Sequence, residues 1–442
     1  MWNKIKSDLS LQIILSVVLA ATIFAPIGSS SLADNEIILW INQNIFSLGG
    51  DLFMNALKML ILPLVVCGLL TGIVSMSDVS KMKSLAIGTV GLYLMTTVIA
   101  LVGALTLASL YSSLIGFGSV DTSGVEAAVT TSSEGLAAMV ANIIPSNIVI
   151  AMYDGNMLAV IFVVVLFSIA TVTVSPAIRE TVASGADNAN EIVLKATGII
   201  MSFAPYGIFC LMAKTFIANG VDTMLPLLGY VIVLVSMLLL HIVVTYGAVV
   251  KFVAGVSPKM FFSKMKEIWV FAFSTGSSSA TIPVTMKVVE KRMGVSSSSA
   301  SFTIPLGATI NMDGTACMQG IATIFVAAIY GIDLTFAALA TVVVTATMAS
   351  IGTAGTRGAG IIMLSMVFSQ VGLPLEGIAL LMSIDPILDM LRTATNVTGD
   401  SAVTLAVASR NGSLDKEVFN TPLKQQLDAE DIEEKGVKAA SA

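Results

Sequence analysis

Six long apolar stretches occupy the first 255 residues of the chain. They lie near residues 8–26, 51–76, 84–113, 140–173, 188–217 and 223–253, and each is close to or longer than the roughly 20 residues that a helix needs to cross a bilayer. The fourth stretch is interrupted between Tyr153 and Asn156, and Pro63 and Pro205 predict kinks in the second and the fifth. Residues 1–255 are therefore predicted to form an N-terminal region of six membrane helices.

The pattern changes after residue 255, where the apolar segments become shorter and Ser, Gly, Thr and Pro interrupt them. This predicts two re-entrant helical hairpins, at 258–292 and 334–371, which alternate with a seventh helix at 298–330 and an eighth at 375–411. Residues 256–411 would form one core. The polar residues 412–442 would form a disordered cytoplasmic tail. The predicted fold class is an all-α polytopic membrane protein.

Composition and charge agree with a membrane protein. Only 11% of the 442 residues are charged and 56% are hydrophobic, whereas about a quarter of the residues of a soluble domain are charged. Lys and Arg gather near 81–83, 179–195, 251–266, 287–292 and 410–416, while the candidate outer loops carry Asp and Glu. The positive-inside rule places the basic clusters and both termini in the cytoplasm of a multi-pass protein of the cell membrane.

The first apolar stretch is expected to be a membrane helix rather than a cleaved signal peptide. Lys4 and Lys6 precede it, but no small-residue cleavage site follows and the next segment is another span.

Histidine and cysteine are scarce. His241 lies inside an apolar run with no partner nearby in sequence, so we interpret it as a helix residue rather than a proton relay. Cys67, Cys210 and Cys317 show no metal-binding spacing, and a disulfide framework is not expected.

Four polar or Gly-rich motifs interrupt the apolar sequence of the second part. They are Ser274–Pro283, Asn311–Thr315, Gly352–Gly360 and Asp385–Asp400. Chain breaks and carboxylates at membrane depth are costly, so such motifs usually line a functional cavity. A Gly/Ser-rich break followed by Asn-x-x-Gly occurs twice, which predicts a repeated unit of a hairpin and a broken helix, as secondary transporters place around a midplane site.

The Asn311–Thr315 motif predicts an unwound turn in the seventh helix, because Asn, Asp and Gly disfavour a continuous helix. Such a turn frees backbone carbonyls, which suit a small hard cation whose charge a carboxylate neutralises. Asp313 and Asp400 are the candidate carboxylates, and sodium is favoured over a transition metal because His and Cys ligands are missing. The alternative is a polar kink that neighbouring helices satisfy.

The two hairpin tips are candidate gates. Hydroxyls and free amides at Ser277–Ser279 would suit a carboxylate if helix N-termini converge there, although Ser runs are also common in flexible turns. The glycines of 352–360 would permit a second, mobile tip that folds over a ligand.

The eighth helix carries both signs of charge on one face, which Asp385, Asp389, Arg392 and Asn396 share. Thr393 lies beside them. Arg can hold a carboxylate by a bidentate fork, and Asp can hold an ammonium. The alternative is an internal Asp–Arg salt bridge that only stabilises the helix. An ion channel would need pore-lining rings instead, and an enzyme would need a nucleophile with its base or a metal cluster.

In this order and spacing, the four motifs resemble the dicarboxylate/amino acid:cation symporter family, which includes glutamate/aspartate and excitatory amino acid transporters. The resemblance covers about residues 8–411. It implies eight transmembrane helices with two re-entrant hairpins, inverted repeats and a homotrimer, and no enzymatic activity. The first, second, fourth and fifth helices would form the trimer scaffold, and the third and sixth would move with residues 256–411 in an elevator-type mechanism.

The function that the resemblance implies is sodium-coupled import of L-aspartate or L-glutamate. Sodium would be co-transported without a prosthetic group, and no nucleic-acid partner is expected. A C4-dicarboxylate carrier, a neutral amino acid carrier and a proton-coupled variant remain as alternatives.

The resemblance also implies the roles of individual residues. Arg392 would bind the side-chain carboxylate of the substrate and Asp389 its amino group, while Asn396 and the Ser278 backbone would take the α-carboxylate. Thr315 and Thr393 would add contacts. The hairpin tips add Ser277, Gly355 and, as our own hypothesis, Arg357, so the predicted substrate-binding residues are Ser277, Ser278, Thr315, Gly355, Arg357, Asp389, Arg392, Thr393 and Asn396.

Three sodium sites are implied in the same way. The first would combine Asp400 with carbonyls of Gly307, Asn311 and Asn396. The second would use carbonyls of Thr309, Ser350, Ile351 and Thr353 beside Met312, and the third would use Tyr93, Thr96, Thr97, Asn311 and Asp313.

The sequence departs from the family pattern in two respects. Relatives carry a second arginine either before the triple serine or just before the substrate arginine, where this chain has Gly276 and Leu391. Arg357 in the second hairpin tip is our candidate for the missing charge. Gln319 stands where animal transporters have a proton-carrying Glu, which argues against proton antiport and potassium countertransport.

Overall fold

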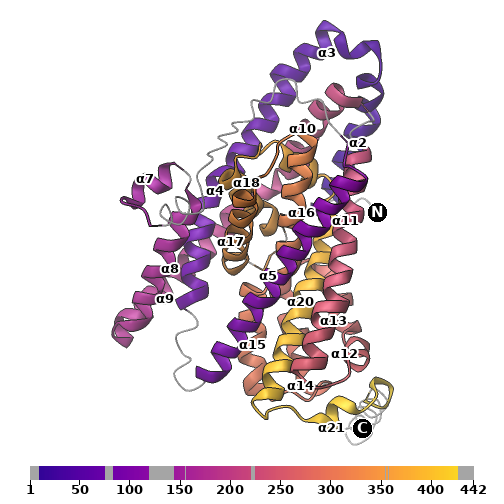
Figure 1. Ribbon diagram of the computed structural model, residues 1–442. Coiled ribbons are helices and arrows are strands. Elements are labelled where there is room, and N and C mark those ends of the chain that lie inside the picture. Colours follow the sequence, from indigo (N-terminus) through magenta and orange to yellow (C-terminus); the bar gives the residue numbers. More distant parts are fainter. Residues whose placement is uncertain are drawn as a thin grey trace, which may run out of the picture.

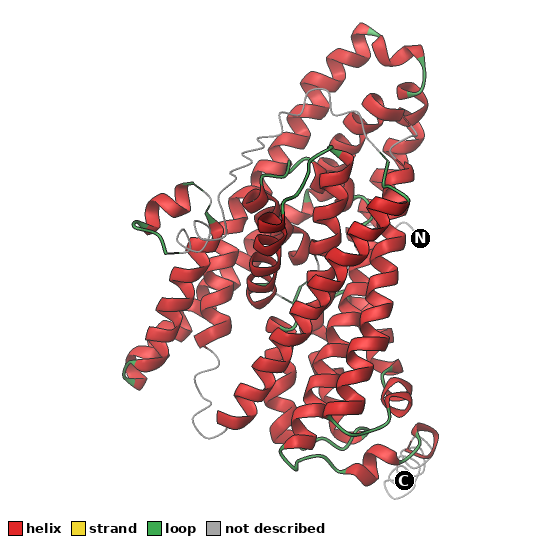
Figure 2. Cartoon of the chain, viewed as in Figure 1, coloured by secondary structure: helices red, strands yellow, loops and turns green. Residues whose placement is uncertain are grey.

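The computed structural model describes residues 9–74, 83–118, 144–154, 156–220, 224–353, 355–356 and 358–426. These residues form an all-helical protein (Figure 2). The one β-bridge among them is isolated and joins Val295 to Leu414. The predicted all-α class is therefore confirmed.

A first group of helices comes from the N-terminal half. α10 packs against α2 and α4, and α4 packs against α8 and α9. Their bounds are α2 Leu9–Gly28, η1 Ser31–Asp34, α3 Glu36–Ile41, η2 Asn42–Phe46, α4 Ser47–Val74, α7 Ile148–Tyr153, α8 Met157–Thr173, α9 Pro176–Ser202 and α10 Ala204–Asn219.

A second group packs around α16 and α20, which contact each other and α5. Its first members are α5 Lys83–Leu114, α11 Met224–Leu240, η5 His241–Tyr246, η6 Val249–Val253, α12 Pro258–Lys264, α13 Lys266–Thr275 and α14 Ser278–Lys291. Its later members are α15 Ser297–Ile310, α16 Asp313–Ile329, α17 Phe336–Gly352, α18 Ala359–Val371, α19 Gly377–Met382, α20 Asp385–Arg410 and α21 Lys416–Asn420. Figure 1 shows α8 and α9 on one side of the molecule and α13, α14 and α20 on the other.

The two predicted hairpins are present as antiparallel helix pairs. α13 packs against α14 in the first, and α17 packs against α18 in the second. α17 and α18 also contact α4, and α19 contacts α10, so these are places where the two groups of helices meet.

Five helices of the described chain are long and apolar enough to cross a membrane, and a bent pair makes up to six. The bent pair is α9 and α10, which meet at 51°. Pro205 lies in the first turn of α10 and cannot continue the α9 ladder, so the predicted kink is confirmed there. Pro63 lies within an uninterrupted α4. The predicted break between Tyr153 and Asn156 separates α7 from α8.

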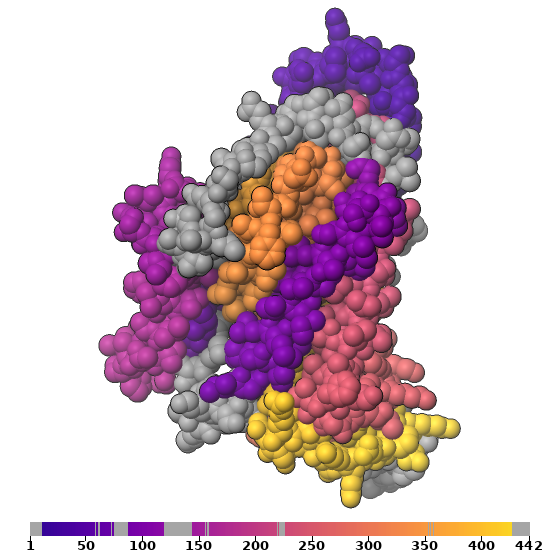
Figure 3. All heavy atoms as spheres, viewed as in Figure 1, coloured from indigo at the N-terminus to yellow at the C-terminus, as the bar shows by residue number. Residues whose placement is uncertain are grey.

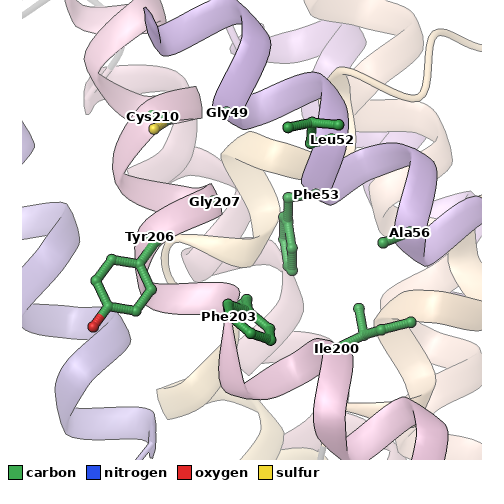
Figure 4. Close-up of a pocket in the computed structure, with 9 residues that line it drawn as sticks. All are labelled: Gly49, Leu52, Phe53, Ala56, Ile200, Phe203, Tyr206, Gly207 and Cys210. Carbon is green, nitrogen blue, oxygen red and sulfur yellow. The ribbon is translucent and has the colours of Figure 1, made fainter.

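A pocket of 280 Å³ lies at the α9–α10 bend, between α4 and the bent pair (Figure 4). Phe53 of α4 points into it, and Tyr206 points away from it. A Cβ on Gly207 would lie 2.3 Å from the Phe53 ring, so α10 approaches α4 this closely only because residue 207 is glycine.

The predicted break of the seventh helix is confirmed, and the predicted break of the eighth is wrong. Asn311 and Met312 leave helical geometry at φ −98°, ψ 75° and φ −106°, ψ 51°. By contrast, α20 continues without interruption through Asn396 and Gly399. A Cβ on Gly399 would lie 2.4 Å from Asn311 Nδ2 and from the Tyr246 hydroxyl. This glycine therefore permits close packing and does not unwind the helix.

The prediction of a disordered tail is wrong for residues 412–426. Asp415 caps the N-terminus of α21, its own N–H donates to Gly294 O at 2.8 Å, and Ser296 N–H donates to Ser413 O at 3.0 Å. Figure 3 shows these C-terminal residues, in yellow, covering the base of the molecule. Residues 427–442 lie outside the described chain.

Lys264, the last residue of α12, binds the C-terminal segment to the start of hairpin 1. The buried ammonium donates to Arg292 O at 2.6 Å, Val418 O at 3.1 Å and Phe419 O at 2.7 Å. Burial, with a smaller contribution from nearby Arg292, lowers the pKa of Lys264 to about 8, although the three carbonyl acceptors oppose that shift. The carbonyls of Val418 and Phe419 thus accept hydrogen bonds from a buried ammonium, and these bonds help to order a polar segment.

Candidate functional site

The break between α15 and α16 leaves backbone groups that hairpin 2 satisfies. Met312 N–H donates to Ser350 Oγ at 3.1 Å, and the Ser350 hydroxyl donates to Ile310 O at 3.3 Å. Both Asn311 and Ser350 are fully buried. The unwound turn is therefore held against α17 rather than left open.

One side of the break faces α5. Thr97 Oγ1 donates to Asp313 Oδ1 at 2.5 Å, and Thr96 Oγ1 lies 3.3 Å from Asn311 Oδ1. Both hydroxyls also lie within hydrogen-bond distance of Tyr93 O, at 3.0 Å for Thr96 and 2.9 Å for Thr97. The structure thus brings together all five residues of the third implied sodium site, and their oxygens are the hard ligands that sodium prefers.

Asp313 has two further partners that the sequence did not reveal. His241 Nε2 lies 3.1 Å from Asp313 Oδ2, and the Tyr246 hydroxyl donates to the same oxygen at 2.8 Å. All three residues are buried. His241 is a helix residue with no partner nearby in sequence, as expected, but tertiary packing supplies one 72 positions away. Periodicity could not have shown this contact.

The other side of the break faces α20. Asn311 Nδ2 donates to Asp400 Oδ1 at 3.0 Å and to Asn396 O at 3.4 Å. A Cβ on Gly307 would lie 2.5 Å from Asp400 Oδ1, so the carboxylate rests against that glycine. The four residues of the first implied sodium site therefore lie together.

Fewer hydrogen bonds connect the residues of the second implied sodium site to one another. Met312 is bonded to Ser350, and α15 contacts α17. The side chains of Thr309 and Thr353 donate within their own segments, to Leu306 O and Ala349 O. Ile351 lies half-buried in the last turn of α17.

The tips of the two hairpins touch. Ser277 Oγ donates to Gly355 O at 2.6 Å, and Ser279 N–H donates to the same oxygen at 3.1 Å. Ser277 also caps α14, because its side chain accepts from Ala280 N–H. Gly276, which precedes Ser277, adopts the left-handed conformation at φ 57° and reverses the direction of the chain between α13 and α14. These contacts close the space between the hairpins and α20.

Arg392 is engaged by two carboxylates of its own helix. Its Nη2 lies 2.6 Å from Asp389 Oδ1 and its Nη1 lies 2.8 Å from Asp385 Oδ1. Only 1% of the arginine side chain is exposed. Asp389 Oδ2 also accepts from Gly358 N–H of hairpin 2 at 3.3 Å. The arginine and both aspartates thus form a buried, charge-dense cluster next to the second hairpin tip.

Asn396 is held by the first turn of α16. Its Oδ1 accepts from Gly314 N–H at 2.8 Å, and its Nδ2 lies 3.5 Å from Met312 Sδ. A Cβ on Gly314 would lie 2.5 Å from Arg392 O. The glycine of the Asn-Met-Asp-Gly-Thr motif therefore permits α16 and α20 to touch.

A small cavity lies where these elements meet. Its free volume is about 10 Å³, enough for no more than about one water molecule. It is lined by Gly276, Ser278, Met312, Thr315, Thr353, Gly355, Thr356, Gly360, Asp389, Thr393 and Asn396. Most of the implied substrate residues therefore surround one closed cavity, and Arg392 lies behind Asp389.

Comparison with known proteins fits this geometry. The sequence profile of the sodium:dicarboxylate symporter family matches residues 9–410. The chain belongs to this family.

Similar proteins within the family transport several substrates with different ions. The chain is 31% identical to a proton/glutamate-aspartate symporter of Escherichia coli over 94% of this chain and 95% of the relative. It is 31% identical to a proton/sodium-glutamate symport protein of Bacillus caldotenax, over 83% and 88%. It is 30% identical to C4-dicarboxylate transport protein 3 of Bradyrhizobium diazoefficiens, over 98% and 95%.

The family membership settles the general class of the molecule. Family members are symporters and not enzymes, and this chain with its apolar spans is a multi-pass membrane transporter.

The departures from the family pattern can be placed in part. Arg357 lies outside the described residues. Gln319 is fully buried in α16, and within the described chain neither of its amide atoms has a hydrogen-bond partner. Leu391 faces away from the cavity and lines an apolar groove on the other side of α20.

Proposed function

We propose that this chain is a sodium-coupled symporter that imports L-aspartate or L-glutamate. The observation that carries the proposal is the pairing of Asp389 and Arg392 next to a cavity closed by both hairpin tips. A ligand with one ammonium and two carboxylates can replace both halves of this ion pair. Asp389 would take the ammonium, and the guanidinium would take the side-chain carboxylate by its fork.

Substrate entry requires a defined set of contacts to break. The cavity is too small for an amino acid, so the bonds from Ser277 and Ser279 to Gly355 must open first. Asp385 keeps the guanidinium oriented through its own contact when Asp389 turns to the substrate. A buried charge is then never left without a partner, which would cost several kcal/mol.

Sodium coupling is supported by the two buried carboxylates on either side of the helix break. Asp313 and Asp400 are each less than 2% exposed. Within the described part of the chain, their hydrogen-bonding neighbours are hydroxyls, an amide and one histidine rather than lysine or arginine. Bound sodium would supply the positive charge that these sites need, and the released carbonyls would complete its oxygen shell. Binding of sodium would also fix Asn311 and α16 in place for the substrate.

Transport would proceed by an elevator movement. The second group of helices, α5 and α11–α20, would move as the transport domain. The first group, α2, α4 and α7–α10, would remain as the scaffold of a homotrimer in the cell membrane, with both termini cytoplasmic. The division of the helix contacts into these two groups supports the assignment. Exposed apolar side chains of the scaffold, such as Leu52, Phe203 and Tyr206, are available for contact with a second copy.

A C4-dicarboxylate is the second candidate substrate. The observation that favours it is that Asp389 already accepts from Arg392 and from Gly358 N–H. A ligand without an ammonium would need only the arginine.

Uptake into proteoliposomes separates these candidates. With an inward sodium gradient, labelled aspartate and glutamate should accumulate, whereas succinate and serine should not. Accumulation of succinate without aspartate would favour the C4-dicarboxylate carrier. Replacing sodium by choline at constant pH should abolish uptake, and unchanged uptake driven by a proton gradient would overturn sodium coupling.

A further inference from the structure

An apolar groove of 240 Å³ lies between α11, η5, α13 and α20, on the face of α20 opposite the closed cavity. Its walls are formed by Val235, Leu238, Leu239, Ile242, Val243, Phe262, Trp269, Phe273, Leu391, Ala394 and Thr395. Leu239 and Val243 are 54% and 62% exposed. The groove therefore opens to the surroundings of the protein along the α11 helix.

The two polar side chains among the described wall residues are already engaged. The Trp269 indole donates to Thr398 Oγ1 at 2.8 Å, and the Thr395 hydroxyl donates to Leu391 O at 3.0 Å. The remaining wall consists of aliphatic and aromatic side chains. A polar solute would lose its hydration here without gaining hydrogen bonds, so the groove suits a hydrocarbon chain.

The groove lies at membrane depth. The α11 span runs from Pro226 to Val253 and is long and apolar enough to cross the bilayer. The wall from Val235 to Val243 extends over about 12 Å of that helix. At this depth, the hydrocarbon chains that can enter the groove are those of membrane lipids.

Three exposed lysines flank one end of the groove. Lys251 follows the wall residue Val243 along the same span. Lys259 precedes Phe262 by three positions and Lys266 precedes Trp269 by three, so each shares a helix face with an aromatic wall residue. Lys251 Nζ also lies 5.2 Å from the Phe252 ring.

The nearby acid does not neutralise these lysines. Glu267 is the acidic residue of α13, and its carboxylate contacts Arg292 at 2.9 Å and Lys287 at 3.9 Å. Among the described residues, the acid next to Lys266 is thus engaged by other cations, and the charge of the three lysines can meet an external anion.

We propose that the groove binds one anionic membrane phospholipid, with an acyl chain between α11, α13 and α20 and the phosphate near Lys251, Lys259 and Lys266. Moving an acyl chain from contact with other lipids to contact with an apolar protein wall changes its free energy little. Selection therefore comes from charge, at roughly fivefold in affinity for each lysine near the surface. The bound chain supports the face of α20 behind Arg392 and the outer face of the hairpin 1 arm.

Trp269 provides a direct readout, because brominated acyl chains quench a tryptophan that they touch. We would use the full chain with Trp2 and Trp40 replaced by phenylalanine, in nanodiscs of phosphatidylcholine. Brominated phosphatidylglycerol should quench Trp269 at a mole fraction at least tenfold lower than brominated phosphatidylcholine. Equal quenching by the two lipids would overturn the proposal.

Two sets of variants locate the head group and the chain. Replacing Lys251, Lys259 and Lys266 by glutamine should remove the preference for phosphatidylglycerol, whereas the same change at Arg179, Lys195 and Lys291 should preserve it. Val243→Phe should fill the groove and weaken quenching, while the matched change Val244→Phe, at an exposed neighbour outside the groove, should not.

Three results would contradict binding of an anionic phospholipid in this groove. If the two lysine sets behave alike, or if Val243→Phe and Val244→Phe quench alike, the site is not this groove. If brominated oleate displaces phosphatidylglycerol at equal concentration, the ligand class is a free fatty acid and our assignment is wrong. Because the readout is binding, it does not depend on the identity of the transported substrate.

Discussion

Gly355 lies where the tips of the two hairpins meet, and replacing it with alanine should separate them. A Cβ at this position would lie 2.3 Å from Ser279 Oγ, 2.8 Å from Ala308 O and 2.9 Å from Ser279 N. The hydroxyl can rotate away, but the two backbone atoms cannot. The closed arrangement therefore becomes strained by the substitution.

The magnitude follows from the contacts that compete. Keeping the tips together would impose an overpacking cost of about 1–3 kcal/mol. Parting them sacrifices two hydrogen bonds to Gly355 O, worth about 1–3 kcal/mol together. Either way, the ratio of closed to open tips should fall by a factor of about 5 to 150. If only the closed form retains substrate, the apparent Kd rises by up to the same factor.

The assay is equilibrium binding of labelled aspartate to the purified chain in saturating sodium. Gly91→Ala is the control, because Gly91 is an exposed glycine of α5 and a Cβ there meets nothing within 4 Å. A Kd for Gly355→Ala within twofold of the wild-type value, with Gly91→Ala also unchanged, would refute the reasoning.

Three further outcomes are expected. Arg392→Lys should weaken aspartate binding at least tenfold, because an ammonium cannot form the guanidinium fork; Arg410→Lys at the exposed end of α20 should not, and equal affinities of both variants by equilibrium binding would contradict the role. Asp400→Asn should lower the apparent sodium affinity measured by uptake, and an unchanged sodium dependence would remove Asp400 from the cation site. Lys264→Met should remove a pH dependence of stability. The native pKa of about 8 is below the ordinary 10.5, so the native state loses its proton first and the free energy of unfolding gains from this group as pH rises through that window. The melting temperature of the wild type relative to Lys264→Met should therefore rise between pH 8 and 10.5, and a flat or falling difference would contradict the burial of that ammonium.

The sequence predicted elements well where apolar runs and breaking residues agree. Both hairpins and the unwound turn at Asn311 occur within a few residues of the expected positions. These features depend on local chemistry, since Asn, Gly and Pro disfavour regular helix wherever they occur.

The same glycine signal was misleading in α20. Gly399 resembles a helix breaker in the sequence, but it stays helical because Asn311 and Tyr246 approach it closely. A sequence does not distinguish a glycine needed for backbone freedom from one needed for close packing. Only the neighbouring helices decide between them.

Contacts between segments far apart in the sequence could not be predicted from it either. His241 meets Asp313 across 72 positions, and Lys264 meets Phe419 across 155. Each joins a residue that looked ordinary in its own segment to a partner that tertiary packing supplies. Residues 413–419 are held by such contacts with Lys264, Gly294 and Ser296, which the polarity of the segment alone could not show.

Because the C-terminal segment holds the base of hairpin 1, a rotation of the hairpin about that base would move its tip most. Lys264, Gly294 and Ser296 bind the base of the hairpin to residues 413–419. The arm α14 has 14 residues between that base and the tip, a length of about 20 Å. A rotation of only about 10° about a fixed base would carry the tip through about 3–4 Å over that length, enough to break both bonds to Gly355. A small angular change at the base of hairpin 1 would thus decide whether the two tips stay in contact.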